Sequence, residues 1–372
     1  MTDLPNIRLP VDLKPTDGRF GSGPSKVRVE AVERLAATGK TLLGTSHRRP
    51  AVVGLVEKLR DGLGDLFSLP DGYEVLVGLG GATAFWDAAT FSLIERRSQH
   101  VVIGEFSSKF AAAVSGAPHL ETPEVIQAEY GHVERPVASD EIDTYALIHN
   151  ETSTGVMVPI ERPATDGLVV VDATSAAGAL PVDPHQFDAY YFSPQKAFGS
   201  EGGMWAALCS PAAITRITEL TGGDRWIPPF LDLGIALTNS RKNQTYNTPA
   251  LATLALFVDQ VEWMNDSGGL TWATERCASS ARTIYGWAEA AGYAQPFVTD
   301  PDARSATVAT IDFDDSVPAA EVSGVLRANG IVDTESYRKL GRNQLRIALF
   351  PAIDPHDVEI LTAAIDHIVE RL

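Results

Sequence analysis

The 372-residue chain has only two cysteines, Cys209 and Cys277, and they lie far apart in the sequence. Two isolated cysteines make neither a disulfide framework nor a metal-binding motif, and they suit a reducing cytosol. Residues 1–5 lack the basic and then apolar pattern of a secretory signal peptide. No apolar run approaches the roughly 20 residues needed to cross a bilayer. We therefore expect a soluble, cytoplasmic protein without a membrane partner or a metal site.

Basic residues are also scarce, since 30 Lys and Arg face 48 Asp and Glu, for a net charge of −18. Nucleic-acid affinity comes largely from clustered Lys and Arg, so this balance argues against a nucleic-acid partner. The hydrophobic fraction of 44% is ordinary for a globular protein. The length allows one large domain and a smaller one. An anionic substrate would need a local group of basic side chains.

One lysine follows an aromatic β-type run, Tyr190–Phe192, and small residues and glycines come after it. Such a lysine, Lys196, is either an ordinary surface lysine in a turn or an amine that forms a Schiff base with a carbonyl compound. A second apolar run upstream, Leu168–Val171, ends in Asp172. Pyridoxal phosphate needs such a pair, a lysine for its aldehyde and an acid for its ring nitrogen.

A glycine turn lies between a predicted strand that begins at Tyr73 and a predicted helix, Ala84–Ile94. It contains Gly80, Ala82 and Thr83. A strand, a glycine turn and a helix start can bind phosphate through backbone N–H groups and the helix dipole. The turn lacks the third glycine and the later acidic residue of a dinucleotide fingerprint, which weakens a nicotinamide interpretation. A plain strand–helix turn remains the alternative.

Further apolar runs end in polar or aromatic residues, and helix-length segments separate them. His100–Phe106 predicts a strand ending in an aromatic residue, and Tyr145–Ile148 one followed by the polar loop that holds Thr152. Trp205–Cys209 is a candidate antiparallel strand. This order predicts a mainly parallel sheet, whose ligands gather at the carboxyl ends of its strands. The residues expected at that edge are Thr83, Phe106, Thr152, Asp172 and Lys196.

Basic residues gather at two places. The loop Gly44–Pro50 holds His47, Arg48 and Arg49, and it is either a solvated cluster or an anion site. Arg346 lies within an apolar strand, where an arginine is costly unless it meets an anion, and Arg338 and Arg342 precede it.

The chain is expected to divide into an N-terminal arm (1–25), a large domain (26–267) and a small C-terminal α+β domain (268–372). Predicted helices of the large domain include Val27–Thr38, Val52–Leu66 and Ala250–Asn265. Asn247 or Thr248 is a candidate N-cap for the last of these, with Pro249 at its first position.

In these motifs the sequence resembles the class V, fold-type I pyridoxal-phosphate aminotransferases, and within them the phosphoserine aminotransferase branch. The resemblance covers essentially the whole chain. It is carried by Ser22-Gly23-Pro24, Ser46-His47-Arg48, Gly80-Gly81-Ala82-Thr83, Asn150-Glu151-Thr152, Asp172 with Ser175, Gln195-Lys196, Tyr246-Asn247-Thr248-Pro249 and Leu345-Arg346-Ile347-Ala348. It implies a large domain with a mainly parallel seven-stranded sheet and a homodimer with shared active sites.

The resemblance also implies a role for each matching residue. Lys196 would bind the aldehyde of the cofactor, Asp172 would pair with its ring nitrogen, and Phe106 would stack on its ring. The phosphate and nearby oxygens would be bound by Ala82, Thr83, Thr152 and Gln195, and by Asn247 and Thr248 of the second subunit. Substrate anions would be bound by Arg346 at the α-carboxylate and by His47 and Arg48 at the distal group.

The implied reaction moves the amino group of L-glutamate to 3-phosphohydroxypyruvate, giving O-phospho-L-serine and 2-oxoglutarate in serine biosynthesis. A related phosphorylated keto acid would serve pyridoxine biosynthesis. The sequence departs from the family pattern at three positions. Phe106 replaces the usual stacking tryptophan, and Thr83 replaces an arginine, for which Arg49 is a candidate substitute. The His-Arg pair before the last strand is absent, and Arg338 or Arg342 is a candidate replacement.

Alternative functions share part of this pattern. Alanine– or serine–glyoxylate aminotransferases would keep Lys196 and Asp172 but need no basic loop, so His47 and Arg48 count against them. A cysteine desulfurase needs a reactive cysteine in the small domain, and neither cysteine is suitably placed. A non-catalytic binding protein with this fold is opposed by the intact lysine–aspartate pair.

Overall fold

A seven-stranded sheet forms the centre of the computed structural model, which describes residues 5–372. In sheet order the strands are β1 (Glu74–Leu79), β9 (Met204–Cys209), β8 (Ala189–Phe192), β7 (Leu168–Asp172), β4 (Thr144–Ile148), β2 (Ser98–Val102) and β3 (Glu124–Gln127). Neighbours from β8 to β3 are parallel, whereas β9 is antiparallel to β8 and to β1. The expected fold class and the antiparallel strand at Trp205–Cys209 are confirmed.

Helices cover both faces of this sheet, which explains why its central strands are apolar throughout. Along β7, Val169 and Val171 pack in one cluster with α2 (Pro50–Leu66) and α7 (Leu251–Asp266). Val170, which points to the other face, packs with α3 (Gly81–Ser92) and its neighbours. The remaining elements of this part are α1 (Val29–Leu42), α4 (Glu105–Ser115), β5 (Asn150–Glu151), β6 (Val156–Met157), α5 (Pro211–Gly222), α6 (Leu233–Ser240) and two 3₁₀ turns, Pro184–Gln186 and Pro229–Leu231.

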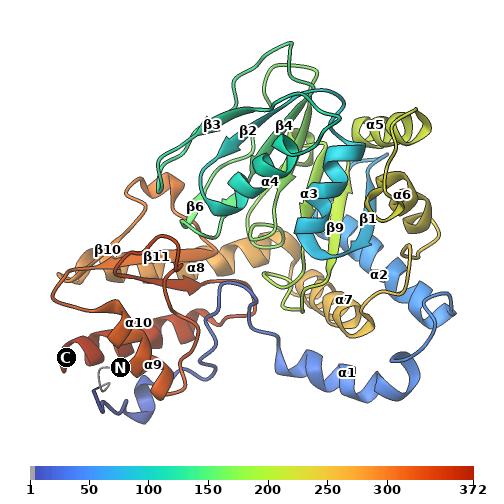
Figure 1. Cartoon of the computed structure of the whole chain (residues 1–372). Helices are drawn as coiled ribbons and strands as arrows, with labels where there is room; N and C mark the ends of the chain where they lie inside the picture. The colour runs from blue at the N-terminus through green and yellow to red at the C-terminus, as the bar shows by residue number, and fades with distance from the viewer. Residues whose placement is uncertain (1–4) are drawn as a thin grey trace.

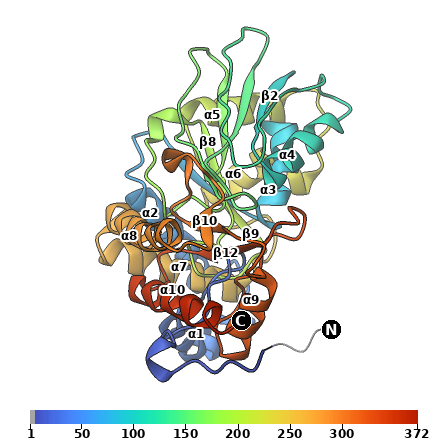
Figure 2. The same cartoon turned by 90° about the vertical axis from the view of Figure 1, so that its left-hand side faces the viewer.

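A smaller antiparallel sheet has its own hydrophobic cluster. It contains β10 (Ala294–Pro296), β11 (Val308–Phe313) and β12 (Gln344–Ala348), and it packs with α8 (Gly269–Ala290), α9 (Ala319–Ala328) and α10 (Pro355–Val369). Figures 1 and 2 show this sheet between α9 and α10 on one side and the large part on the other. A 3₁₀ turn, Pro301–Ala303, lies between β10 and β11. The expected α+β composition of the C-terminal part is confirmed.

The N-terminal segment packs against this smaller part. Leu9 and Phe20 belong to its hydrophobic cluster, on either side of a 3₁₀ turn at Val11–Leu13. In Figure 1 the blue segment runs beside α9 before it crosses to α1. The first four residues of the expected arm lie outside the described residues. The division at residues 25 and 267 remains a proposal, because α8 contributes to both large clusters.

Three local predictions need correction. The strand expected to end at Phe106 ends at Val102, and Phe106 is the second residue of α4. The helix expected at Ala84 begins three residues earlier, at Gly81, because Gly80 adopts a left-handed conformation with φ of 100° and turns the chain directly into it. Neither Asn247 nor Thr248 caps α7, since its N-cap is Ala250.

Candidate active site

A cavity of about 380 Å³ lies beyond the carboxyl ends of β4, β7 and β8. Parallel strands collect ligands at this edge of a sheet. Seven residues expected from the sequence line the cavity together: Ala82, Thr83, Phe106, Thr152, Asp172, Gln195 and Lys196. The strand order, which places β4, β7 and β8 side by side, is what brings these distant segments into one place.

Lys196 lies in the turn after β8 and is only 7% exposed. Its Nζ donates to the Ser22 carbonyl oxygen at 2.8 Å and lies 3.2 Å from Thr152 Oγ1. Gly23 makes this approach possible, since a Cβ there would lie 2.6 Å from Nζ. The interpretation of Lys196 as a surface lysine in a turn is therefore wrong.

Burial lowers the pKa of Lys196 to about 7, and the positive charge of Arg346 acts in the same direction. The carboxylates of Asp172 and Glu151 oppose this shift. A neutral amine is the nucleophilic form, so Lys196 is prepared to attack a carbonyl compound near neutral pH.

Asp172 ends β7 and is held by two hydrogen bonds. The Thr174 backbone N–H donates to Oδ1 at 2.9 Å, and Trp86 Nε1 donates to Oδ2 at 3.3 Å. Burial raises the pKa of Asp172, whereas these donors and Lys196 act against that rise. A cationic group bound in the cavity would further favour the carboxylate. Trp86 was not among the residues expected at the site, although it lies one helical turn after Ala82 and Thr83.

Besides Lys196 and Asp172, the amino end of α3 faces the cavity. Its first residues, Gly81, Ala82 and Thr83, line the cavity, so their backbone N–H groups and the helix dipole favour an anion there. Gln195 also lines the cavity, and its Oε1 is buried without a hydrogen-bond partner among residues 5–372.

These three features fit pyridoxal phosphate. The cavity offers an amine for its aldehyde, a carboxylate for its ring nitrogen and a helix N-terminus for its phosphate. Thr174 Oγ1 and Asn150 Oδ1, from two further lining residues, are also buried and lack a partner within the described part of the chain. Such unsatisfied groups are costly unless a ligand binds them.

Phe106 lines the cavity, and Tyr337 and Arg346 lie next to lining residues without lining it themselves. The Lys196 Nζ lies 5.7 Å from the centre of the Phe106 ring, and the Tyr337 ring lies 6.3 Å from Phe106. Arg346 packs over Tyr337 at 5.2 Å and donates to the Thr152 carbonyl oxygen at 3.4 Å. Its Nε is buried and finds no acceptor among residues 5–372, so the guanidinium is available for an anion.

The profile of the Aminotransferase class-V family matches residues 29–334. This chain belongs to the class-V aminotransferase family. A curated relative, the phosphoserine aminotransferase of a Nocardioides species, is 58% identical over 376 residues and covers 100% of both chains.

Solved structures have the same fold as this class-V aminotransferase. The phosphoserine aminotransferase of Cytophaga hutchinsonii superposes with a TM-score of 0.87 at 24% identity, covering 94% of this chain and 99% of its own. The enzyme of the same name from Bacillus circulans subsp. alkalophilus gives 0.84 at 21%, with 95% and 99% covered.

Other expected residues of this class-V aminotransferase do not line the cavity. Thr248 Oγ1 lies 3.2 Å from His47 Nδ1 in an exposed cluster that we call the outer patch, defined as His47, Arg48, Asn247 and Thr248. These residues come from two loops about 200 positions apart in the sequence.

Arg342 also lies outside the cavity. Its guanidinium binds Asp312, with Nε 3.0 Å from Oδ2, and packs over the Phe297 ring. Within residues 5–372, Arg338 makes no hydrogen bond or ion pair. Neither arginine lines the cavity, and the replacement of the absent His-Arg pair by one of them stays a prediction.

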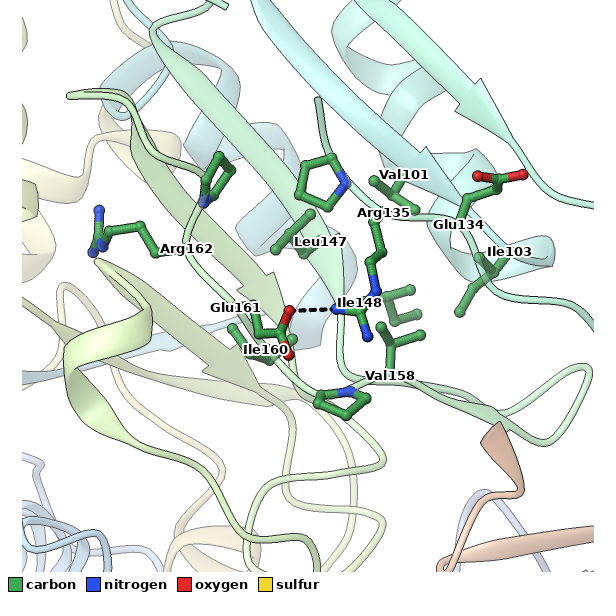
Figure 3. A pocket seen from close by; sticks show the side chains of 13 residues that line it. Val101, Ile103, Glu134, Arg135, Leu147, Ile148, Val158, Ile160, Glu161 and Arg162 are labelled. Carbon is green, nitrogen blue, oxygen red and sulfur yellow. Dashed lines mark hydrogen bonds and ion pairs between the residues drawn. The ribbon is translucent and has the colours of Figure 1, made fainter. Parts of the chain in front are cut away.

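A second cavity, of about 130 Å³, lies beside β2 and β4 (Figure 3). Its walls are mainly aliphatic side chains and prolines, and Arg135 pairs with Glu161 at 2.5 Å near its rim. It contains no lysine and no buried acid, so it lacks the chemistry of the first cavity.

Within residues 5–372, no group of three or more His, Cys, Asp or Glu side chains is arranged to bind a metal ion. No helix in the same range has the length and hydropathy of a transmembrane span.

Proposed function

We propose that this protein is a phosphoserine aminotransferase that uses pyridoxal phosphate. It transfers the amino group of L-glutamate to 3-phosphohydroxypyruvate and yields O-phospho-L-serine and 2-oxoglutarate. The observation that carries the reaction class is the buried pair of Lys196 and Asp172, which face one cavity closed by the amino end of α3. The substrate follows from full-length similarity at 58% identity to a curated phosphoserine aminotransferase.

Lys196 has two tasks in this proposal. It holds the cofactor covalently between turnovers, and its freed amine then moves a proton from the substrate Cα, a role for which a pKa of about 7 is well matched. Asp172 keeps the ring nitrogen protonated, and its bonds from Thr174 and Trp86 fix the carboxylate. The bound cofactor supplies an electron-withdrawing ring that stabilises negative charge at Cα.

Arg346 is proposed to bind the α-carboxylate shared by all substrates. Its unpartnered Nε and its position between Thr152 and Tyr337 support this role, because a planar guanidinium binds a carboxylate through two parallel hydrogen bonds. Phe106 is proposed to stack on the cofactor ring. Ala82, Thr83, Thr152 and Gln195 are proposed to bind the cofactor phosphate and nearby oxygens.

The outer patch is proposed to complete the active site of a second copy of the chain. Asn247 and Thr248 would reach the cofactor phosphate there, and His47 and Arg48 would bind the distal phosphate or carboxylate. The support is that Arg48, Asn247 and Thr248 are exposed, that His47 is half-buried, and that all four lie outside the cavity of their own chain. A homodimer with shared sites follows from this proposal. A cytoplasmic location and a second role in pyridoxine biosynthesis remain predictions that rest on the resemblance.

The first test is the visible absorption spectrum of the purified protein with and without amino acids. We expect a cofactor band that O-phospho-L-serine and L-glutamate both bleach, because each converts the bound cofactor to its aminated form. Bleaching by alanine or serine but not by phosphoserine would keep the reaction class and favour a glyoxylate aminotransferase. A protein without a band after incubation with pyridoxal phosphate would refute the proposal.

A further inference from the structure

A buried glutamate that has no assigned role binds the start of α4. Glu151 is fully buried, and its carboxylate accepts hydrogen bonds from backbone and hydroxyl donors. Phe106 N and Ser107 N each lie 3.1 Å from Oε2, and the Ser107 hydroxyl lies 3.0 Å from the same oxygen. Ser153 donates to Oε1 through its backbone at 3.2 Å and through its hydroxyl at 2.6 Å.

This carboxylate replaces a local helix cap. The N-cap residue of α4 is Gly104, which has no side chain to accept bonds from the first helical N–H groups. Those groups are satisfied from a distant loop instead, since Ser153 Oγ accepts from Glu105 N at 3.0 Å and Glu151 accepts from the next two residues. A Cβ on Gly104 would lie only 2.4 Å from Glu151 Cγ. The glycine therefore makes room for the carboxylate.

The same loop faces the reacting lysine. Glu151 and Ser153 point toward α4, whereas Thr152 between them lies 3.2 Å from the Lys196 Nζ. Phe106, whose N–H binds Glu151, borders the cavity 5.7 Å from that amine. Three consecutive residues thus connect the Phe106 ring to Lys196 through short, buried contacts.

We propose that Glu151 is a positioning residue, which fixes the Phe106 ring over the cofactor by capping α4 from the Thr152 loop. This inference rests on the proposed function, because it concerns a ring stacked on pyridoxal phosphate. A carboxylate suits the task because it accepts from several donors at once and is favoured at a helix N-terminus. An amide of the same shape places an NH₂ group against donors and leaves some of them unsatisfied.

The test compares Glu151→Gln with Glu105→Gln in two measurements. Glu105 lies in the same helical turn, but its carboxylate pairs with Lys339 and Lys109, whereas Glu151 accepts from the amides of Phe106 and Ser107. The first measurement is hydrogen exchange at the amides of Phe106 and Ser107 in protein freed of cofactor. The second is circular dichroism in the visible cofactor band, which reports how the bound ring is held in its asymmetric site.

We expect Glu151→Gln to speed exchange at these two amides by about tenfold or more, because bonds to a charged acceptor are lost. It should also lose at least about half of the visible ellipticity per bound cofactor, since the stacked ring becomes mobile. Glu105→Gln should leave both values unchanged. If Glu151→Gln fails to fold, Ser107→Ala removes one donor to the carboxylate together with the hydroxyl that accepts from Ile103 N and Gly104 N. It should shift both values in the same direction, with Ser108→Ala as its control.

Unchanged exchange in Glu151→Gln would overturn the cap, and faster exchange with wild-type ellipticity would overturn the positioning of Phe106. Failure of the proposed function gives a different result, because the wild-type protein itself would then show no cofactor band.

Discussion

The cavity and the outer patch contain residues expected at one active site, yet their surroundings differ. In the cavity, Lys196 and Asp172 are buried, hold defined hydrogen bonds and have shifted pKa values. In the outer patch, Arg48 and Asn247 are exposed, and Thr248 contacts His47. Burial prepares the first group for chemistry within one chain. The second group gains a comparable environment only if another surface covers it.

A single chain supplies the whole cavity, whereas we attribute a role for the outer patch to a dimer. The cavity holds the amine, the acid and the helix N-terminus that the cofactor requires. It lacks a group for a distal phosphate other than the partly exposed Lys109, which already pairs with Glu105 at 3.5 Å. Mutations in the cavity should therefore affect all substrates. Mutations in the outer patch should affect only substrates with a distal anionic group, such as phosphoserine and glutamate.

The largest effect is expected from Lys196→Ala. Loss of the amine removes both the covalent attachment and the proton transfer, so turnover should fall by more than about a thousandfold. Single-turnover assays and the absorption spectrum after denaturation, which shows whether cofactor stays attached, measure this change. A variant with residual turnover near wild type would remove the cavity from consideration as the active site.

The second largest effect on activity is expected from Arg346→Ala. We expect kcat/KM to fall by about tenfold to a hundredfold for every amino acid and keto acid, because a charge-assisted bond to the shared α-carboxylate is lost. Steady-state kinetics with phosphoserine, glutamate and alanine check this. A loss confined to phosphoserine would instead place Arg346 at the distal anion.

The pH dependence of cofactor attachment tests the buried amine directly. Since the pKa of Lys196 is lowered to about 7, the fraction of neutral amine rises with pH below that value and is nearly complete above it. The rate of attachment to cofactor-free protein should rise about tenfold per pH unit below pH 7 and then level off. Stopped-flow absorbance with pyridoxal, which lacks the titrating phosphate, measures it. A rate that keeps rising to pH 10 would show an ordinary lysine.

Arg48→Ala should have a smaller and selective effect. We expect kcat/KM for phosphoserine and glutamate to fall by about tenfold, with alanine unchanged, because only the distal anion loses a charged partner. Equal losses for all three substrates would contradict this role.

A mixture of Arg48→Ala and Lys196→Ala tests whether the two chains of a dimer share their active sites. In a mixed dimer with shared sites, one of the two sites has an intact Lys196 and an intact Arg48. Phosphoserine activity should therefore exceed the sum of the separate variants after subunit exchange. Strict additivity would show that each chain works alone.

The smallest effect on activity is expected from Arg342→Ala. Because Arg342 binds Asp312 outside the cavity, kinetic constants should stay within about twofold of wild type. The stability loss should be about 1–3 kcal/mol, because the Asp312 carboxylate is buried and keeps Gln344 as its side-chain partner. Denaturant unfolding and steady-state kinetics measure the two. A clear loss of phosphoserine turnover would show that Arg342 reaches the site during catalysis.

Much of the fold and of the cavity could be predicted from local patterns. Apolar runs ending at Asp172 and before Lys196 show strands buried on both faces, and their order along the chain shows a parallel sheet. Phe106 was assigned to a strand because helix capping from a distant loop leaves no local signal. Trp86 was missed because a tryptophan in an apolar helix has the same pattern whether it packs in the core or also binds Asp172.

The amino-acid sequence alone predicts the cofactor chemistry, because a lysine and an aspartate that follow buried strands lie at the same edge of a parallel sheet. The strand order then places the two residues side by side. The tertiary structure decides which arginine is available for an anion, although Arg346 in β12 and Arg342 in the loop before it lie only four residues apart. Packing leaves Arg346 Nε without an acceptor among residues 5–372, whereas Asp312 binds Arg342. Partners of this kind come from distant segments, and no local pattern encodes them.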